Sequence, residues 1–228
     1  MSDYFEKQYS ILDDNKSKTG LAQFGPMASF TWNTDPKRLL FVLSRYKFAA
    51  KILEGYDNVL EVGCGDGFSA RIVKQHVKKL VLSDVDPKMI AFAKKVQSSE
   101  FPVSFISHNF VKEPLKKLSN KFDGIYLLDV LEHIDEKEEN HFLLNLKSCM
   151  DKNGTIIIGM PSIESQLYAS EGSKKGHINC KTKENLLSLM KKHFNSCSSF
   201  SMNDEVVHTG FARMSNYIFC VGSGVVSK

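Results

Sequence analysis

Three glycines at alternate positions form the segment of this sequence best suited to holding a ligand. Gly63, Gly65 and Gly67 directly follow the apolar run Asn58–Val62, and Glu61 stands two residues before the first of them. Glycine permits backbone dihedrals that other residues avoid, and it lets the chain approach a ligand closely. A carboxylate at the end of a buried strand needs donors, either loop amides or a ligand ammonium. A tight turn that binds nothing would use the same glycines.

A second acidic residue closes the next apolar run. Asp84 ends residues 80–84, 23 positions after Glu61. In nucleotide-binding folds, an acid at this point accepts hydrogen bonds from both ribose hydroxyls. Asp84 could instead cap the following helix, but Asp86, just before Pro87, is better placed for that role. The acids and the glycines together favour a bound nucleotide over an empty turn.

The pattern departs from the one that binds dinucleotides. That motif needs a glycine three positions after Gly65, where this chain has Phe68. An acid as close to the loop as Glu61 also sits badly beside a pyrophosphate. It suits a ligand with a positively charged amino-acid end and an adenosine ribose. An NAD-dependent oxidoreductase is therefore the less favoured alternative.

Short apolar runs alternate with helix-like stretches through the middle of the chain. The runs cover residues 58–62, 80–84, 103–107, 122–128 and 154–159, and two later β-like segments cover residues 199–202 and 217–221. Between them, residues 87–96 and 135–150 carry apolar side chains at three- and four-residue steps. Strands this uniformly apolar, alternating with helices, predict an α/β fold with a parallel sheet covered on both faces.

The first 56 residues are not needed by this core. A helix is predicted over residues 35–54, with Asp35 as its N-cap. The stretch before it has little periodicity but many aromatic residues, including Trp32, the only tryptophan of the chain. We expect residues 1–56 to form a helical extension that closes over the ligand as a lid. Packing of these aromatic residues along the sheet edge is the alternative.

The segment Glu61-Val-Gly-Cys-Gly-Asp-Gly67 resembles the nucleotide loop of class I S-adenosylmethionine-dependent methyltransferases, in the branch that methylates small molecules. The resemblance covers roughly residues 55–161 and includes the segment Asp129-Val-Leu-Glu-His133. It implies a Rossmann-like, doubly wound sheet of about seven strands, mostly parallel, with the last strand antiparallel. It also implies residues 57–228 as the methyltransferase domain, S-adenosylmethionine as cofactor and S-adenosylhomocysteine as product.

The resemblance also assigns a cofactor site. It implies that the acid and glycines of the loop flank the methionine end, that Asp84 holds the ribose and that Val85 packs on the adenine. Asn109 stands where many members have an Asp facing the adenine amino group, and an amide oxygen can accept the same hydrogen bond. Asp129 and Val130 would line the pocket near the sulfonium. The full set of expected contacts is Glu61, Gly63, Cys64, Gly65, Gly67, Asp84, Val85, Asn109, Phe110, Asp129 and Val130.

Histidines on the ligand side of the predicted sheet are candidates for proton transfer. Methyl transfer from a sulfonium needs no metal, so we expect none here, but a hydroxyl acceptor must lose its proton as it attacks. His133 follows the fourth strand and His177 lies in a loop before the helix at Thr182, so either could be the general base. His133 could equally anchor the helix that begins at Asp135. His208, between the last strands, is a third candidate.

Composition narrows the class of protein. The 228 residues are 42% hydrophobic and 25% charged, which is ordinary for one soluble domain and excludes a disordered chain. Five cysteines, widely spaced, argue against a disulfide framework or structural zinc and indicate a cytoplasmic location. No apolar run approaches the ~18 residues of a spanning helix, and no secretory signal is visible.

The net charge and the motifs of the chain limit the class of methyl acceptor that we expect. The net charge of +4 comes without a basic stripe, and the chain lacks the Asn/Asp-Pro-Pro-aromatic motif that holds a flipped base. Both features argue against nucleic acid as a partner. The expected acceptor is a sugar- or quinone-like small molecule methylated on a hydroxyl or an amine. A methyltransferase-like protein that binds the nucleotide without turnover is the alternative.

Overall fold

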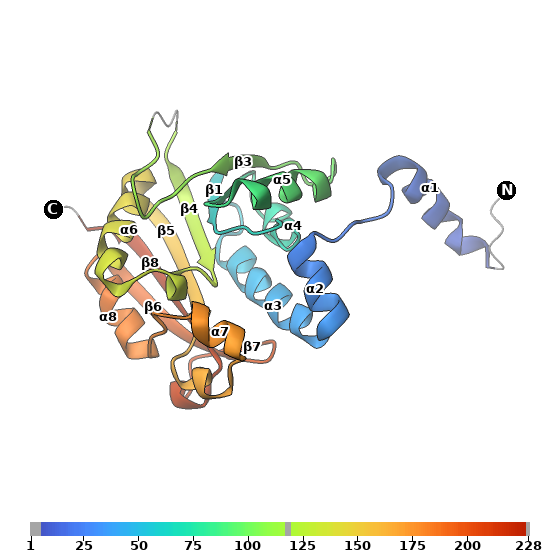
Figure 1. Cartoon of the computed structure of the whole chain (residues 1–228). Coiled ribbons are helices and arrows are strands. Elements are labelled where there is room, and N and C mark those ends of the chain that lie inside the picture. The colour runs from blue at the N-terminus through green and yellow to red at the C-terminus, as the bar shows by residue number, and fades with distance from the viewer. Residues whose placement is uncertain (1–5, 117–119, 227–228) are drawn as a thin grey trace.

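The computed structural model describes residues 6–116 and 120–226, and an eight-stranded sheet forms the centre of this part of the chain (Figure 1). The strand order is β3-β2-β1-β4-β5-β8-β6-β7. The parallel strands are β1 (Asn58–Val62), β2 (Lys79–Asp84), β3 (Ser104–Ser107), β4 (Phe122–Leu128) and β5 (Met150–Pro161). Antiparallel pairings add β8 (Tyr217–Val225), β6 (Phe194–Asn203) and β7 (Val206–His208).

The predicted doubly wound, mostly parallel α/β fold is confirmed, and the strand count is corrected. The described residues form eight strands rather than about seven, because the predicted loop after β6 contains the three-residue strand β7. A strand of three residues is too short for an alternating pattern to reveal it. Three C-terminal strands, rather than only the last, pair antiparallel.

Helices cover both faces of the sheet. One face packs against α6 (Glu136–Cys149) and α8 (Lys183–Lys191), and the other against α3 (Lys37–Ile52), α4 (Ala70–Lys74) and α5 (Pro87–Val96). Side chains alternate along a strand, so Leu60 of β1 joins the first core and Val59 joins the second. With both faces buried, every position of the parallel strands favours an apolar residue, which explains the uninterrupted runs in the sequence.

Side-chain caps begin three of these helices as the sequence predicts. Asp86 accepts a hydrogen bond from the Lys88 amide at the start of α5, Asp135 caps α6 and Thr182 caps α8. The predicted cap at Asp35 is wrong. The amide of Asp35 closes α2 (Pro26–Thr34) by bonding to the Thr31 carbonyl, so Asp35 belongs to the end of that helix and α3 begins at Lys37.

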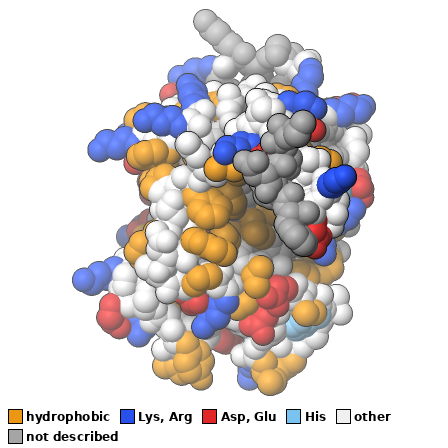
Figure 2. All heavy atoms as spheres, turned by 90° about the vertical axis from the view of Figure 1, so that its right-hand side faces the viewer, with side chains coloured by type: hydrophobic (Ala, Val, Ile, Leu, Met, Phe, Trp, Pro, Cys, Tyr) orange, Lys and Arg blue, Asp and Glu red, His pale blue; other side chains and the backbone are white. Residues whose placement is uncertain are grey.

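The N-terminal extension is helical. The short turn η1 (Lys7–Tyr9) leads into α1 (Ser10–Thr19), which buries no residue and projects from the domain (Figure 1). α2 lies against the body of the protein, yet Trp32 is 51% exposed. Figure 2 shows hydrophobic side chains gathered on this face of the molecule. The first five residues of the predicted lid lie outside the described range.

The remaining short helices lie in the connections that follow β4, β5 and β7. They are η2 (Leu131–His133), η3 (Glu164–Tyr168), α7 (Glu171–Gly176) and η4 (Ala212–Met214). η3 and α7 occupy the stretch that the sequence suggests is a loop. No helix within residues 6–116 and 120–226 combines the length and apolar character that crossing a bilayer requires.

Candidate active site

The glycine loop joins β1 to α4, and it needs glycine for two different reasons. Gly63 has φ of 76°, and a Cβ there would lie 2.4 Å from Cγ2 of Val130, so both backbone shape and space require glycine. At Gly67, a Cβ would lie 3.0 Å from the Cβ of Ala93 in α5. The first glycine therefore lets the loop turn beside the post-β4 segment, and the third lets α5 approach it closely.

Asp84 ties this loop to the end of β2. One carboxylate oxygen accepts a hydrogen bond from the Gly65 amide at 2.9 Å, and the other accepts one from the Asp86 amide at 2.9 Å. The carboxylate thus lies at the carboxyl ends of two parallel strands, where ligands bind in open α/β sheets. It shapes the loop as well as presenting a charge to a ligand.

A cavity of about 390 Å³ opens beside the loop and Asp84. Nine of the residues singled out in the sequence line it: Gly63, Gly65, Asp84, Val85, Asn109, Phe110, Asp129, Val130 and His133. Val85 is 62% exposed, so its side chain is accessible from the cavity. The Asn109 side-chain oxygen accepts a bond from the Val111 amide. The Phe110 side chain is buried in the core, with one side on the cavity.

Further lining residues were not anticipated. They are Met27, Val62, Ser83, Met89, His108, Val111, Ile134 and Phe142. Met89 lies one turn after the Asp86 cap, so helical spacing from Asp86 could have indicated it. Met27 comes from α2, far away in the sequence, and no local pattern marks it.

Three expected contact residues do not line this cavity: Glu61, Cys64 and Gly67. Glu61 is 1% exposed, and its two carboxylate oxygens accept hydrogen bonds from the hydroxyls of Tyr46 and Tyr126, each at 2.6 Å. Burial raises the pKa of Glu61 to about 7, although the two tyrosine bonds act in the opposite direction. The donors that this buried acid requires are therefore tyrosines.

Asp129 stands at the end of β4 in an unusual conformation. It has φ of 58°, a region that residues other than glycine rarely adopt. Both of its carboxylate oxygens accept hydrogen bonds from one guanidinium nitrogen of Arg45, at 3.0 and 2.8 Å. Arg45 comes from α3 and also lies over the ring of Tyr217, 3.9 Å from its centroid. A strained, charge-paired residue beside a cavity is typical of a functional site.

A second cavity, of about 870 Å³, lies beyond this ion pair. Arg45 and His177 line it, together with residues of α3, of the segment after β5 and of the loop before β8. His177 and His133 are ring neighbours, with centroids 5.2 Å apart, although each lines a different cavity. Burial, and then the neighbouring His133, lower the pKa of His177. His177 is thus a neutral base at pH 7.

His208 is not part of this arrangement. It lies on β7, where its ring nitrogens contact the Asn203 side chain and the Gly210 amide. Neither cavity is lined by it. The structure therefore brings His133 and His177 together and leaves the third candidate elsewhere.

Comparisons with known proteins agree with this geometry. Residues 34–214 match a family described as a methyltransferase domain. The ubiquinone biosynthesis O-methyltransferase of Coxiella burnetii (strain RSA 493 / Nine Mile phase I) is 24% identical over 140 residues, 57% of this chain and 56% of that protein. The chain thus spans about half the length of these curated relatives.

Solved structures share the fold over most of the chain. The N-methyltransferase NodS from Bradyrhizobium japonicum WM9, in complex with S-adenosyl-L-homocysteine, has a TM-score of 0.62 and 15% identity, covering 96% of this chain and 99% of its own. An S-adenosylmethionine-dependent methyltransferase from Archaeoglobus fulgidus has a TM-score of 0.62 and 15% identity. The match covers 82% of this chain and 94% of that protein. On its family match and its fold, this chain belongs to the class I S-adenosylmethionine-dependent methyltransferases.

Proposed function

We propose that the protein transfers a methyl group from S-adenosylmethionine to a hydroxyl or amine of a small, sugar- or quinone-like acceptor. The observation that carries this proposal is the pair of adjoining cavities with His133 on one and His177 on the other. One cavity has the residues that a nucleoside with an amino-acid tail requires, and the other is open and lined by polar and aromatic groups.

The smaller cavity is the proposed cofactor site. Asp84 accepts the ribose hydroxyls, exposed Val85 covers one face of the adenine, and Asn109 stands near its edge. Gly63 and Gly65 leave room for the methionine end beside Val130. The cofactor supplies the reactive methyl group, and the protein supplies binding and orientation.

The larger cavity is the proposed acceptor site. Ser165, Gln166 and Ser173 offer hydrogen-bonding groups, and Phe41 and Tyr168 offer ring faces. Such a lining suits a ring that carries several oxygens. Holding the acceptor in line with the methyl group could contribute up to about 7–11 kcal/mol to the acceleration. His133 or His177 accepts the acceptor proton.

Two measurements test this proposal. Calorimetry should give micromolar affinity for S-adenosylhomocysteine, about −8 kcal/mol, and no comparable affinity for NAD. Incubation of the protein with a metabolite extract and S-adenosylmethionine carrying a labelled methyl group, followed by mass spectrometry, should reveal an acceptor that gains the label. Tighter binding of NAD than of S-adenosylhomocysteine would refute the proposal, and binding without any labelled product would identify a non-catalytic relative.

The histidines are tested once the acceptor is known. Replacing the general base, as His133→Gln or His177→Gln, should lower turnover while cofactor affinity stays within about threefold, because the proposed nucleoside contacts are made by Asp84, Val85 and Asn109. His208→Gln is the matched control and should leave turnover unchanged. Normal rates in both of the first two variants would exclude this pair from proton transfer.

A further inference from the structure

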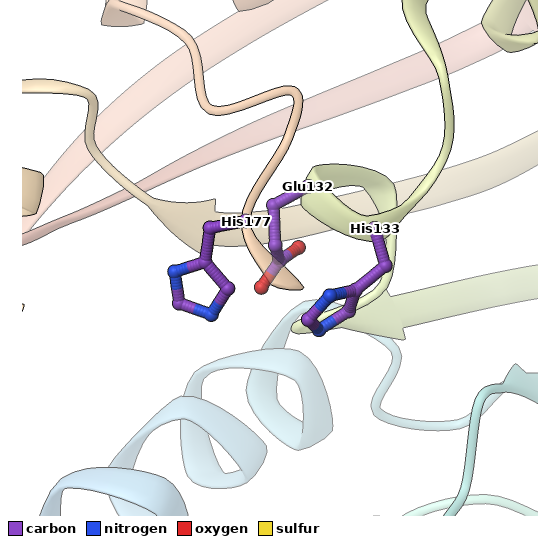
Figure 3. Close-up of side chains that lie close together, drawn as sticks. All are labelled: Glu132, His133 and His177. Carbon is purple, nitrogen blue, oxygen red and sulfur yellow. The ribbon is translucent and has the colours of Figure 1, made fainter. Parts of the chain in front are cut away.

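Three side chains meet where the two cavities adjoin: Glu132, His133 and His177 (Figure 3). One ligand atom from each lies within 4.8 Å of the others. The carboxylate of Glu132 points between the two imidazole rings (Figure 3). Glu132 and His133 are adjacent in η2, and His177 directly follows α7.

Glu132 is the unusual member of this group. It is fully buried, and neither carboxylate oxygen has a hydrogen-bond partner among the described residues. An ionised carboxylate in such surroundings is destabilising by several kcal/mol unless a cation or donor compensates it. Asp129 lies nearby, and its ion-pair partner Arg45 interacts with both carboxyl groups. Arg45 donates its hydrogen bonds to Asp129, however, and leaves both oxygens of Glu132 without a partner among the described residues.

Both histidines are oriented by a hydrogen bond at Nδ1, which leaves the lone pair of Nε2 available to a ligand. Nδ1 of His133 is 2.9 Å from the carbonyl oxygen of Gly176, and Nδ1 of His177 is 2.9 Å from the side-chain oxygen of Gln166. A carbonyl oxygen only accepts, so each Nδ1 carries the proton and each Nε2 keeps its lone pair. Metal-binding histidines are oriented in this way, by a bond from the other ring nitrogen to an oxygen.

The backbone holds the two halves of the cluster together. The Asn179 amide donates to the Glu132 carbonyl at 3.0 Å, and His133 bonds to Gly176 on the same segment. The loop that carries His177 is thus attached to η2 on both sides of the histidine. The three ligand atoms are positioned before any ligand arrives.

We propose that Glu132, His133 and His177 bind a divalent first-row transition-metal ion, such as Mn²⁺. Two imidazoles and one carboxylate are a ligand set that such ions adopt, with positions left open for another ligand. Magnesium and calcium prefer all-oxygen sites. The proposal departs from the expectation of a metal-free site, which the sequence supported only through the chemistry of the cofactor.

The position of the site gives the metal a role, and that role rests on the proposed methyl transfer. A bound cation at this boundary takes an acceptor hydroxyl oxygen as a ligand, and the hydroxyl releases its proton to solvent. The oxygen then forms a bond to the methyl carbon as the bond from that carbon to sulfur breaks. The products are the methyl ether and the uncharged thioether S-adenosylhomocysteine. With the metal bound, this step replaces the proton transfer to His133 or His177 proposed above, because both rings then act as ligands.

Metal binding is measured on the full chain after treatment with a chelator. Electron paramagnetic resonance of added Mn²⁺ should show one ion bound per chain. Glu132→Gln and His177→Gln should each weaken binding at least tenfold. Gln166→Leu, which removes the partner of the His177 ring together with the Gln166 bonds to Ser162 and Ser165, should weaken it about tenfold. The exposed α6 variants Glu138→Gln and His141→Gln are matched controls and should bind Mn²⁺ normally.

Thermal unfolding distinguishes variants that have lost the metal site from variants that fail to fold. Glu132→Gln replaces a buried carboxyl group that has no hydrogen-bond partner among the described residues, so without metal it should unfold at or above the temperature of the unchanged protein. Mn²⁺ should raise the unfolding temperature of the unchanged protein but not that of this variant. Absence of Mn²⁺ binding, equal affinity in all variants, or displacement by an equal concentration of Mg²⁺ would overturn the proposal.

The failure of this proposal is separable from failure of the proposed function. Calorimetry of the metal-free protein with S-adenosylhomocysteine reports the cofactor cavity alone. Cofactor binding without metal binding overturns only the metal site, and metal binding without cofactor binding overturns only the methyl transfer. With an identified hydroxyl acceptor, turnover should fall at least tenfold on chelation and return with Mn²⁺.

Discussion

Two buried glutamates near the cofactor cavity illustrate how differently single residues are compensated. Glu61 accepts bonds from two tyrosine hydroxyls, whereas Glu132 has no hydrogen-bond partner among the described residues. Both lie in apolar surroundings that disfavour the charged form. The first is stabilised within the fold itself, and the second requires something that the described chain does not supply.

Glu61 should make the stability of the fold depend on pH. Its pKa is raised by burial from 4.5 to about 7, with Asp84 and Asp66 adding repulsion. Since the folded protein holds this proton more tightly than the unfolded chain, the stabilisation is complete below about pH 4.5 and is lost as the pH rises through about 7. Between about pH 4.5 and 7, the unchanged protein should lose about 3 kcal/mol of unfolding free energy as Glu61 ionises. Glu61→Gln cannot ionise and should not show this loss.

Urea denaturation at pH 5 and pH 8 measures this effect. The difference in unfolding free energy between Glu61→Gln and the unchanged protein should shift in favour of the variant at the higher pH. Glu138→Gln, an exposed carboxylate, serves as the control for general titration. The same pH dependence in all three proteins would contradict the assignment.

Asp84 should dominate cofactor affinity. Asp84→Asn weakens the bonds to the ribose hydroxyls and to the Gly65 amide, each of which, as a hydrogen bond to a charged group, contributes about 1.5–3 kcal/mol. We expect at least tenfold weaker binding of S-adenosylhomocysteine in calorimetry. Asp86→Asn is the neighbouring control, since Asp86 caps α5 and lies outside the cavity lining. Equal affinity of the two variants would remove Asp84 from the site.

Residues whose roles are set by local chain geometry were predictable from the sequence. The glycines, Asp84 and Val85 follow strands directly, so their placement at the ligand end of the sheet depends only on recognising those strands. Tyr46 and Arg45 come from a helix outside the recognised motif, and their contacts with Glu61 and Asp129 are tertiary. No local sequence pattern indicated either contact.

At the scale of elements, the two N-terminal helices have unequal shares in the site. α1 buries no residue, whereas α2 supplies Met27 to the cavity and its Ala28 amide donates to Asp66 at 2.9 Å. Phe24, just before α2, packs edge-on against Phe68, at 4.8 Å between ring centroids. The lid hypothesis therefore concerns α2 and its flanks more than α1.

Truncation separates these two helices. Removal of residues 1–20 should leave affinity for S-adenosylhomocysteine within about threefold, while removal of residues 1–34 should weaken it at least tenfold, because the cavity then loses its Met27 wall. Trp32 fluorescence should change when S-adenosylhomocysteine binds, and α2 should become protected from protease. Full affinity and turnover in the longer truncation would show that the segment only packs on the surface.

At the scale of the whole molecule, the cofactor should stabilise the entire fold. The cavity joins residues of the core around α6 to the glycine loop, the end of β2 and α2, so its occupancy opposes global unfolding. At a concentration 100-fold above the dissociation constant, the gain is about 2.7 kcal/mol. For a chain of this size, that corresponds to a rise of roughly 5–11 °C in unfolding temperature. Differential scanning fluorimetry with S-adenosylhomocysteine checks this, and NAD should produce no such shift.

The whole-molecule arrangement explains which parts of the fold were hardest to predict. The parallel half follows a repeating strand–helix order, and its elements appear in the sequence with the expected periods. In the C-terminal half, β8 lies between β5 and β6 and pairs with both across long sequence separations, and β7 has only three residues. Pairing of this kind is set by tertiary contacts that leave little trace in a local pattern.

The two cavities draw on different parts of the chain, and this division has an evolutionary consequence. The cofactor cavity depends mainly on the first four strands, whereas the other is built largely from α3 and from the segments around residues 161–177 and 213–216. Under the proposed assignment of the larger cavity to the acceptor, substitutions in those segments can alter which molecule is methylated while the proposed nucleoside contacts stay intact. Selection for a new substrate can therefore proceed through the acceptor-side segments, with the cofactor half inherited unchanged.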